Sequence, residues 1–309
     1  MNQKKYRLVT RSDFDGLVCA VLLNEMELID DIKFVHPKDM QDGKIAITER
    51  DITTNLPYVA SAGLAFDHHL SETIRNPGER GNYIINPDAP SAARVVYDYY
   101  GGKEGFPGIS DEMMAAVNKA DSAQFSREEI LNPTGWVLLN YLMDSRTGLG
   151  RFREFRVSNY TLMMDLIKYC RNHGIEEILQ LPDVRERVEL YNEHTLLAKE
   201  QIQRCTTVHG KLAVLDLRNE ETIYATNRFM IYALFPQTNI SIHVLWGMQK
   251  QNTVFATGKS ILDRSSRTNI GELMLAYGGG GHHAAGTCQI ANEQADATLK
   301  EIIARINAD

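Results

Sequence analysis

Short apolar runs that alternate with helical segments fill the N-terminal part of the chain. The runs typical of strands are residues 6–10, 32–36, 44–48 and 63–66. A helix is expected from about Gly16 to Ile29, between the first two of these runs. Strands that alternate with helices in this way predict a mostly parallel sheet with helical crossovers.

The pattern becomes helical from about residue 90 to residue 204. Ser91 and Ser110 each stand where a helix could begin, and residues 183–204 could form one long helix. Strand signals return at 212–215, 239–245 and 253–257, and a last helix is expected over 293–306.

These patterns of strands and helices predict an α/β protein of two domains. The first, residues 1–185, would hold a doubly wound, mainly parallel sheet. A linker helix would follow over residues 186–208, and residues 209–309 would form a smaller α/β domain.

Composition places the chain among folded proteins. Hydrophobic residues make up 43% and charged residues 24% of the 309 positions. No apolar run approaches the ~20 residues that a membrane-spanning helix needs, and the N-terminal segment is too charged for a signal peptide. The cysteines lie far apart and form no Cys-x-x-Cys pair; they are Cys19, Cys170, Cys205 and Cys288. We therefore expect free thiols in a reducing cytoplasm.

The net charge of −7 bears on the class of partner. A protein that grips long nucleic acid usually carries a basic surface, because contacts with phosphate dominate that affinity. An acidic chain can still bind a short anion through a local group of arginines and metal ions. We therefore expect a small substrate, and neither a long duplex nor a membrane as a partner.

Two carboxylates follow the first strand in the segment 11–16, Arg-Ser-Asp-Phe-Asp-Gly. Ligands of an open parallel sheet bind beyond the carboxyl ends of its strands, so Asp13 and Asp15 are expected at that edge. Residues two apart in an extended segment point the same way, so both carboxylates could converge on metal ions. The alternative is a polar turn in which Gly16 helps the chain to reverse.

A second cluster is Asp67-His68-His69, which also follows an apolar run. Carboxylate and neutral imidazole are usual ligands of Mn²⁺, Fe²⁺ and Zn²⁺. The alternative is a helix-start Asp with two surface histidines. Asp51, beyond the third strand candidate, and Asp121, beyond a helical stretch, could add carboxylates or could be ordinary solvated acids.

A third cluster begins with four glycines at residues 278–281 and continues as His-His-Ala-Ala-Gly over 282–286. Consecutive glycines let backbone N–H groups approach an anion and form a nest for phosphate, which His282 could contact. A flexible linker is the alternative, but linkers favour serine and charged residues over such a continuation into a strand.

In this order the motifs resemble the DHH phosphoesterase superfamily with a C-terminal DHHA1 domain. They are Asp13-x-Asp15-Gly16, Asp67-His68-His69, Asp121 and Gly279-Gly280-Gly281-His282 with Ala285-Gly286. The resemblance covers nearly the whole chain and lies nearest to the nanoRNase/pAp phosphatases and exopolyphosphatase-related proteins. It implies a DHH catalytic domain over 1–185 and a DHHA1 substrate-binding domain over 209–309.

The resemblance also implies two divalent ions, expected to be Mn²⁺. Their ligands would be Asp13, Asp15, Asp51, His68 and Asp121. Asn55 is a competing match for Asp51. Many members carry a histidine where Arg11 stands, and a guanidinium has no free lone pair for a metal. Either one ion therefore has fewer protein ligands, or Arg11 binds a substrate phosphate.

Catalysis would involve Asp67 and His69, with His69 close to the leaving group. Two ions some 3.5–4 Å apart would lower the pKa of a shared water and give a hydroxide that attacks phosphorus in line. The hydroxyl of Ser91 could help to hold an anion at a helix start. In the second domain the expected substrate-binding residues are Arg264, Arg267, Gly279, Gly280, Gly281 and His282. The two arginines could equally be solvated surface residues.

The sequence leaves the substrate open. A short phosphodiester or phosphomonoester is favoured: an oligoribonucleotide, pAp or a linear dinucleotide. Polyphosphate is the rival, because it needs only cations, whereas a nucleotide needs a stacking surface such as Tyr277. The other reading is a non-hydrolytic nucleotide sensor with a degenerate metal site, which Arg11 motivates. A homodimer is plausible in each case.

Overall fold

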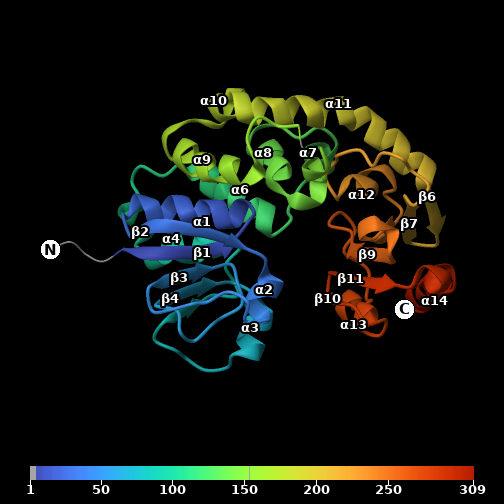
Figure 1. Cartoon of the computed structure of the whole chain (residues 1–309), viewed down its shortest axis with the longest axis horizontal. Coiled ribbons are helices and arrows are strands. Elements are labelled where there is room, and N and C mark those ends of the chain that lie inside the picture. Colours follow the sequence, from blue (N-terminus) through green and yellow to red (C-terminus); the bar gives the residue numbers. More distant parts are fainter. Residues whose placement is uncertain (1–4, 153) are drawn as a thin grey trace. The chain divides into compact units, whose positions relative to one another are not determined.

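The computed structural model describes residues 5–152 and 154–309 (Figure 1). These residues divide into two compact units. The first unit contains the described residues up to 124, with 134–145 and 149–188. The second contains 125–133, 146–148 and 189–309. Within the described residues, no helix combines the length and the apolar character needed to cross a membrane.

The first unit is built on a parallel sheet of five strands. They are β1 (Tyr6–Arg11), β2 (Ile29–Val35), β3 (Asp51–Thr54), β4 (Leu64–Asp67) and β5 (Tyr83–Ile85). Their order in the sheet is β2-β1-β3-β4-β5. The chain moves from β1 to one side and then returns to the other side at β3. The carboxyl ends of β1 and β3 therefore form the switch point at which open α/β sheets bind ligands.

Helix α1 (Phe14–Glu25) is the central helix of this unit. It begins at Asp13, whose side-chain Oδ1 accepts a hydrogen bond from Gly16 N at 3.0 Å. Its residues from Phe14 to Leu23 are all buried, because the helix packs against β1 and against three other helices (Figure 1). Those helices are α4 (Ala92–Tyr99), α6 (Asp111–Asp121) and α9 (Asn159–Asn172).

The turn from β1 into α1 requires a glycine. A Cβ on Gly16 would lie 2.0 Å from the carbonyl oxygen of Arg11, which is closer than any van der Waals contact. The remaining helices of the first unit are α2 (Pro37–Gln41), α3 (Leu70–Arg75), α5 (Gly102–Gly105), α8 (Gly135–Met143) and α10 (Ile175–Gln180). Helix α11 (Pro182–Cys205) contributes residues to both units.

The second unit contains a mixed sheet of six strands. They are β6 (Thr206–His209), β7 (Leu212–Asp216), β8 (Ile240–Trp246), β9 (Thr253–Lys259), β10 (Gly280–His282) and β11 (Ala285–Ile290). Their order is β10-β11-β9-β8-β7-β6, in which only β7 and β8 pair in parallel. The helices of this unit are α7 (Arg127–Leu131), α12 (Met230–Leu234), α13 (Ile270–Leu275) and α14 (Ala295–Ala308).

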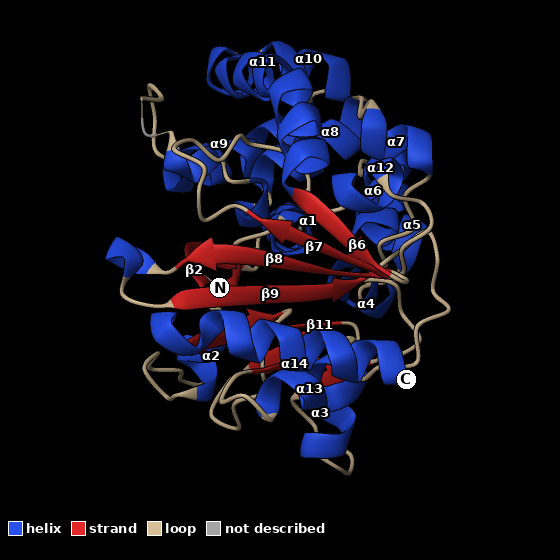
Figure 2. Ribbon diagram, turned by 90° about the vertical axis from the view of Figure 1, so that its right-hand side faces the viewer, coloured by secondary structure: helices blue, strands red, loops and turns tan. Residues whose placement is uncertain are grey.

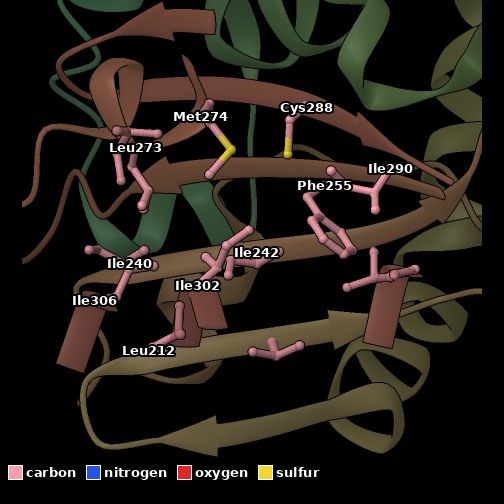
Figure 3. Packing of buried hydrophobic residues seen from close by; sticks show 14 residues of the cluster. Leu212, Ile240, Ile242, Phe255, Leu273, Met274, Cys288, Ile290, Ile302 and Ile306 are labelled. Atoms are coloured by element: carbon pink, nitrogen blue, oxygen red, sulfur yellow. The ribbon is translucent and has the colours of Figure 1, made fainter. Parts of the chain in front are cut away.

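The core of the second unit lies between this sheet and the helices α13 and α14 (Figure 2). Phe255 and Ile242 come from the strands, Met274 from α13 and Ile302 from α14 (Figure 3). Cys288 also lies in this cluster and is buried, as are Cys19 and Cys170. All four cysteines are free thiols, as the sequence predicts.

Most of the predicted elements are confirmed. The α/β class and the parallel first sheet agree with the structure, and the long helix near 183–204 is α11. Ser91 and Ser110 both cap helices, since their side chains accept from Arg94 N and Met113 N. The first helix is shorter than expected. It ends at Glu25, because Glu27 adopts a left-handed φ of 55° before β2 begins at Ile29.

The strand expected at 44–48 is wrong. This segment is a loop, and the third strand of the chain is β3 (Asp51–Thr54). Ile45 and Ile47 account for the misleading pattern, because they pack on a cluster of buried residues instead of pairing in the sheet. That cluster consists of Val9, Val35, Met40 and Leu56.

The glycine run is part of a strand pair. Residues 280–282 form β10, which pairs with β11. A Cβ on Gly279 would lie 2.0 Å from Thr287 O, and one on Gly281 would lie 2.2 Å from Ala285 O. A Cβ on Gly280 would meet nothing within 4 Å. Close packing of two backbone segments therefore accounts for Gly279 and Gly281, but not for Gly280.

This difference gives a matched pair of substitutions. Gly279→Ala should lower the free energy of unfolding of the second unit by about 1–3 kcal/mol, because the added methyl group overpacks the hairpin. Gly280→Ala should change it by less than about 0.5 kcal/mol. Urea unfolding followed by Trp246 fluorescence in a Trp136→Phe background measures the effect, since the chain has two tryptophans. Equal effects of the two substitutions would contradict the steric account.

Candidate functional site

Asp15 provides a buried carboxylate at the carboxyl end of β1. Only 2% of the residue is exposed. Its Oδ1 accepts a hydrogen bond from Ala93 N at 2.8 Å, and its Oδ2 accepts one from Ala92 N at 3.0 Å. These N–H groups belong to the first turn of α4, where a negative charge is favoured. Burial, together with repulsion from Asp121, nevertheless raises the pKa of Asp15, so the ionised form needs a neighbouring cation.

His68 and Asp121 lie next to Asp15. The Nδ1 of His68 lies 3.1 Å from Ala89 O and must be the donor there, since a carbonyl can only accept. The neutral ring therefore presents its lone pair at Nε2, which lies 2.9 Å from Asp121 Oδ2. Asp15, His68 and Asp121 each contribute one possible ligand atom, and these three atoms lie within 4.8 Å of one another. Two carboxylates and an imidazole fit a divalent ion such as Mn²⁺.

His68 and Asp121 shift the pKa of one another. Burial alone would lower the pKa of His68, but its contact with Asp121 outweighs burial and raises that pKa to about 9. The same contact outweighs burial at Asp121 and lowers the pKa of that carboxyl.

Asp67 and His69 form a pair beside this group. The Oδ1 of Asp67 accepts from His69 Nδ1 at 2.7 Å and from His68 N at 2.9 Å. Asp67 is 1% exposed, whereas about a third of the His69 side chain is exposed. Burial would lower the pKa of His69, but the bond to Asp67 outweighs it and raises that pKa. Asp67 thus orients the ring, and Nε2 is the ring nitrogen of His69 that this bond does not use.

Ser91 stands at a helix start as predicted, but its hydroxyl already has two partners within the protein. It is completely buried, its Oγ accepts from Arg94 N at 3.0 Å, and the same hydroxyl donates to Asn118 Oδ1 at 2.8 Å. The hydroxyl therefore ties α4 to α6 and is not exposed to an anion. Asn118 was missed by the sequence analysis. Asn118 lies one helical turn before Asp121, and this spacing could have indicated that both side chains lie on the same face of the helix.

Arg11, Asp13 and Asn55 meet at the switch point between β1 and β3. The Oδ2 of Asp13 lies 2.9 Å from Arg11 Nε. The Oδ1 of Asp13 accepts from Gly16 N at 3.0 Å and from Asn55 Nδ2 at 3.3 Å. Asn55 has a left-handed φ of 55°, a conformation that asparagine tolerates better than most residues.

Asp51 is not near this edge, which corrects its prediction as a metal ligand. It begins β3 and therefore lies at the amino end of that strand. Its carboxylate accepts from Arg7 Nε and from Thr48 N, each at 2.7 Å. Burial would raise the pKa of Asp51, but the hydrogen bonds from Arg7 and Thr48 together outweigh burial and lower that pKa. The wrong assignment of the third strand to 44–48 caused the error, and Asn55 occupies the carboxyl end of the true strand.

In the second unit the predicted residues lie on two neighbouring segments. Arg264 and Arg267 are exposed in the loop between β9 and α13, and His282 is exposed at the end of β10. The end of this loop is held next to His282, because Ile270 N at the start of α13 donates to His283 O at 3.1 Å.

Lys259, which the sequence analysis missed, joins the same two segments. Its Nζ donates to Ser266 O at 3.1 Å and lies 3.4 Å from His283 Nδ1. Tyr277, the stacking candidate of the sequence, is partly buried. Its ring packs against the core, and Arg305 lies over it at 5.5 Å.

Comparisons with known proteins add to this geometry. No protein-family model matches the chain, and no curated protein matches it. Among solved structures, the chain is similar to a pGpG-specific phosphodiesterase, PggH from Vibrio cholerae, with a TM-score of 0.88 and 70% sequence identity. That match covers 99% of this chain and 100% of the other.

Two more distant structures share the fold. RecJ from Thermus thermophilus in complex with Mn²⁺ matches with a TM-score of 0.56 and 13% identity, over 99% of this chain and 53% of RecJ. CDC45 from Entamoeba histolytica matches with a TM-score of 0.51 and 9% identity, over 99% of this chain and 96% of the other. At these identities the likeness concerns the fold alone.

The ligand group can be tested apart from any reaction. His68→Ala and Asp121→Asn should each weaken Mn²⁺ binding by about 100-fold, because the first removes a donor and the second replaces a charged oxygen by a neutral amide oxygen. Asp51→Asn is the matched control. It removes a carboxylate of the same sheet and should leave Mn²⁺ affinity unchanged while it lowers stability. Calorimetric titration of Mn²⁺ measures the affinities, and a loss of affinity in Asp51→Asn would return that residue to the metal site.

Binding of Mn²⁺ should also release protons at pH 7. The pKa of His68 is raised to about 9 and that of Asp15 is raised as well, so both groups carry protons that a metal ion must displace. The affinity for Mn²⁺ should therefore rise as the pH increases from 6 to about 9. Titrations in buffers with different ionisation enthalpies count the protons. A binding enthalpy that does not depend on the buffer would contradict the assignment.

Proposed function

Because the chain belongs to the DHH/DHHA1 phosphoesterase superfamily, we propose that it hydrolyses short linear dinucleotides and that pGpG is its substrate. The chain is a phosphodiesterase by its relationship to PggH, at 70% identity over the whole length of both proteins. The observation that carries the proposal in this chain is the group of Asp15, His68 and Asp121 at the functional edge of the first sheet.

We further propose that the reaction depends on a divalent ion, with Mn²⁺ as the expected one. The RecJ structure of the same fold contains Mn²⁺, and the carboxylate and imidazole donors of this chain suit that ion. A divalent ion in such a site supplies a nucleophile near neutral pH and neutralises charge on a phosphoryl oxygen. The superfamily pattern implies two ions. In this chain the first ion would have three close donors, Asp15, His68 and Asp121. A second ion would depend on Asp13 and on residue 55.

The proposed reaction breaks one phosphodiester bond. The oxygen of a water molecule attacks the phosphorus that joins the two nucleosides, and the bond from phosphorus to the 3′ oxygen breaks. The 3′ oxygen takes a proton, so that pGpG and water give two molecules of 5′-GMP. His69 is the proposed donor of that proton, through Nε2, and the buried carboxylate of Asp67 holds the ring in place.

The second unit has the proposed task of binding the substrate. We assign residues 1–185 to the DHH domain and residues 209–309 to the DHHA1 domain, with a linker helix between them. Arg264, Arg267 and His282 would contact phosphate or nucleoside groups, and the exposure of all three supports this role. Lys259 adds a cation beside them. The identity with PggH favours a dinucleotide over polyphosphate. A homodimer stays a prediction.

An activity screen tests this function. With added Mn²⁺, the purified protein should convert pGpG to GMP at least about tenfold faster than it hydrolyses pAp or polyphosphate, since the relative with 70% identity is specific for pGpG. The substitution His68→Ala should abolish turnover, and Asp51→Asn should preserve it. Faster hydrolysis of polyphosphate would favour the exopolyphosphatase alternative. Tight binding of pGpG without turnover in Mn²⁺, Co²⁺ or Mg²⁺ would favour the sensor.

A further inference from the structure

We propose that the catalytic edge holds one divalent ion per chain, and that the guanidinium of Arg11 provides the positive charge at the place of a second ion. This inference rests on the metal site of the proposed function. It concerns the residues with which this chain departs from the superfamily pattern, Arg11 and Asn55.

The first argument is that Asp13 already has fixed partners on both oxygens. Its Oδ2 is 2.9 Å from Arg11 Nε, a distance typical of a charge-assisted hydrogen bond. Its Oδ1 accepts from the backbone of Gly16, which starts α1, and from Asn55 Nδ2. A metal ion bound to Asp13 would have to lie close to a guanidinium that cannot lose its proton. Asp13 is therefore an anchor for Arg11.

The second argument concerns residue 55. The superfamily pattern has an aspartate that bridges two ions after the third strand, and the position at the carboxyl end of β3 is Asn55 in this chain. A carboxylate can bind two cations through two charged oxygens, whereas an amide offers one neutral oxygen. The amide nitrogen of Asn55 points to Asp13 at 3.3 Å. Asn55 is thus a neutral donor in a place where a second ion would require a negative charge.

The third argument is the balance of charge. With a divalent ion bound by Asp15, His68 and Asp121, the carboxylates of Asp13, Asp15 and Asp121 contribute three negative charges to this edge, and Asp67 is paired with His69. Together with Arg11, one divalent ion neutralises these three negative charges, whereas two ions would leave a net charge of plus two. Because Asp15 is buried and Asp121 lies beside it, such an excess would receive little screening from water.

The position of Arg11 also suits a second task. About a third of its side chain is exposed, so the guanidinium lies at the surface of the edge and can contact a bound anion. A guanidinium presents several donors in a fixed plane and matches a phosphate oxygen pair. A fixed charge at this place would stabilise the phosphoryl group that a second metal ion stabilises in two-metal enzymes.

The experiment counts ions and needs no substrate. Purified metal-free protein is titrated with Mn²⁺, and the bound metal is measured by elemental analysis and by electron paramagnetic resonance. We expect about one Mn²⁺ per chain with the spectrum of an isolated ion. The double substitution Arg11→His/Asn55→Asp restores a ligand and a bridging carboxylate. It should bind about twice as much Mn²⁺ and show the spectrum of a spin-coupled pair.

Arg50→His is the matched control. Arg50 is an exposed arginine before β3, and its replacement by histidine should leave the count at about one. Two ions in the wild-type protein, or a spin-coupled spectrum there, would overturn the inference. A double variant that stays folded by circular dichroism and still binds one ion would also overturn it. If pGpG is not hydrolysed but a single ion is bound, the proposed function fails and this inference stands.

Discussion

The buried carboxylate of Asp15 is the constraint on which the catalytic edge depends. A buried anion is unfavourable unless it is hydrogen-bonded and neutralised. The first turn of α4 supplies two N–H groups to Asp15, and His68 and Asp121 complete a group that suits a cation. Through this one side chain, the β1–α1 turn is joined to α4, and the ends of β4 and α6 gather around it. The same arrangement that stabilises the fold thus gathers three donor side chains that could hold a divalent ion.

The strand order explains why the unusual residues lie where they do. Because the chain leaves β1 on one side and returns at β3 on the other, the carboxyl ends of these strands are neighbours. Arg11 ends β1 and Asn55 follows β3, and both contact Asp13. A change at one position of this trio alters the charge that the other positions can tolerate. Arg11 and Asn55 are therefore best understood together, because both act on the carboxylate of Asp13.

The second unit shows how one motif can serve two purposes. Gly279 and Gly281 are required because backbone segments approach each other closely in the β10–β11 hairpin. The same hairpin carries His282 and His283, next to a loop with Arg264 and Arg267. Packing therefore explains two of the glycines without any ligand. The exposed cationic side chains are the part of the motif that points to substrate binding.

The sequence by itself determined the α/β class, the order of the motifs, the helix starts at Ser91 and Ser110, and the side chains Asp15, His68 and Asp121. These features depend on local chemistry, on periodicity and on motif order, which a single chain displays directly. Only the tertiary structure decided that Asp51 pairs with Arg7 and that Asn55 reaches the edge. The apolar pattern at 44–48 is satisfied by packing on a buried cluster as well as by a strand. Pairing between strands depends on contacts that are distant in the sequence. A third strand at 44–48 would place Asp51 beyond its carboxyl end, whereas the observed strand at 51–54 places Asp51 at its amino end and Asn55 beyond its carboxyl end.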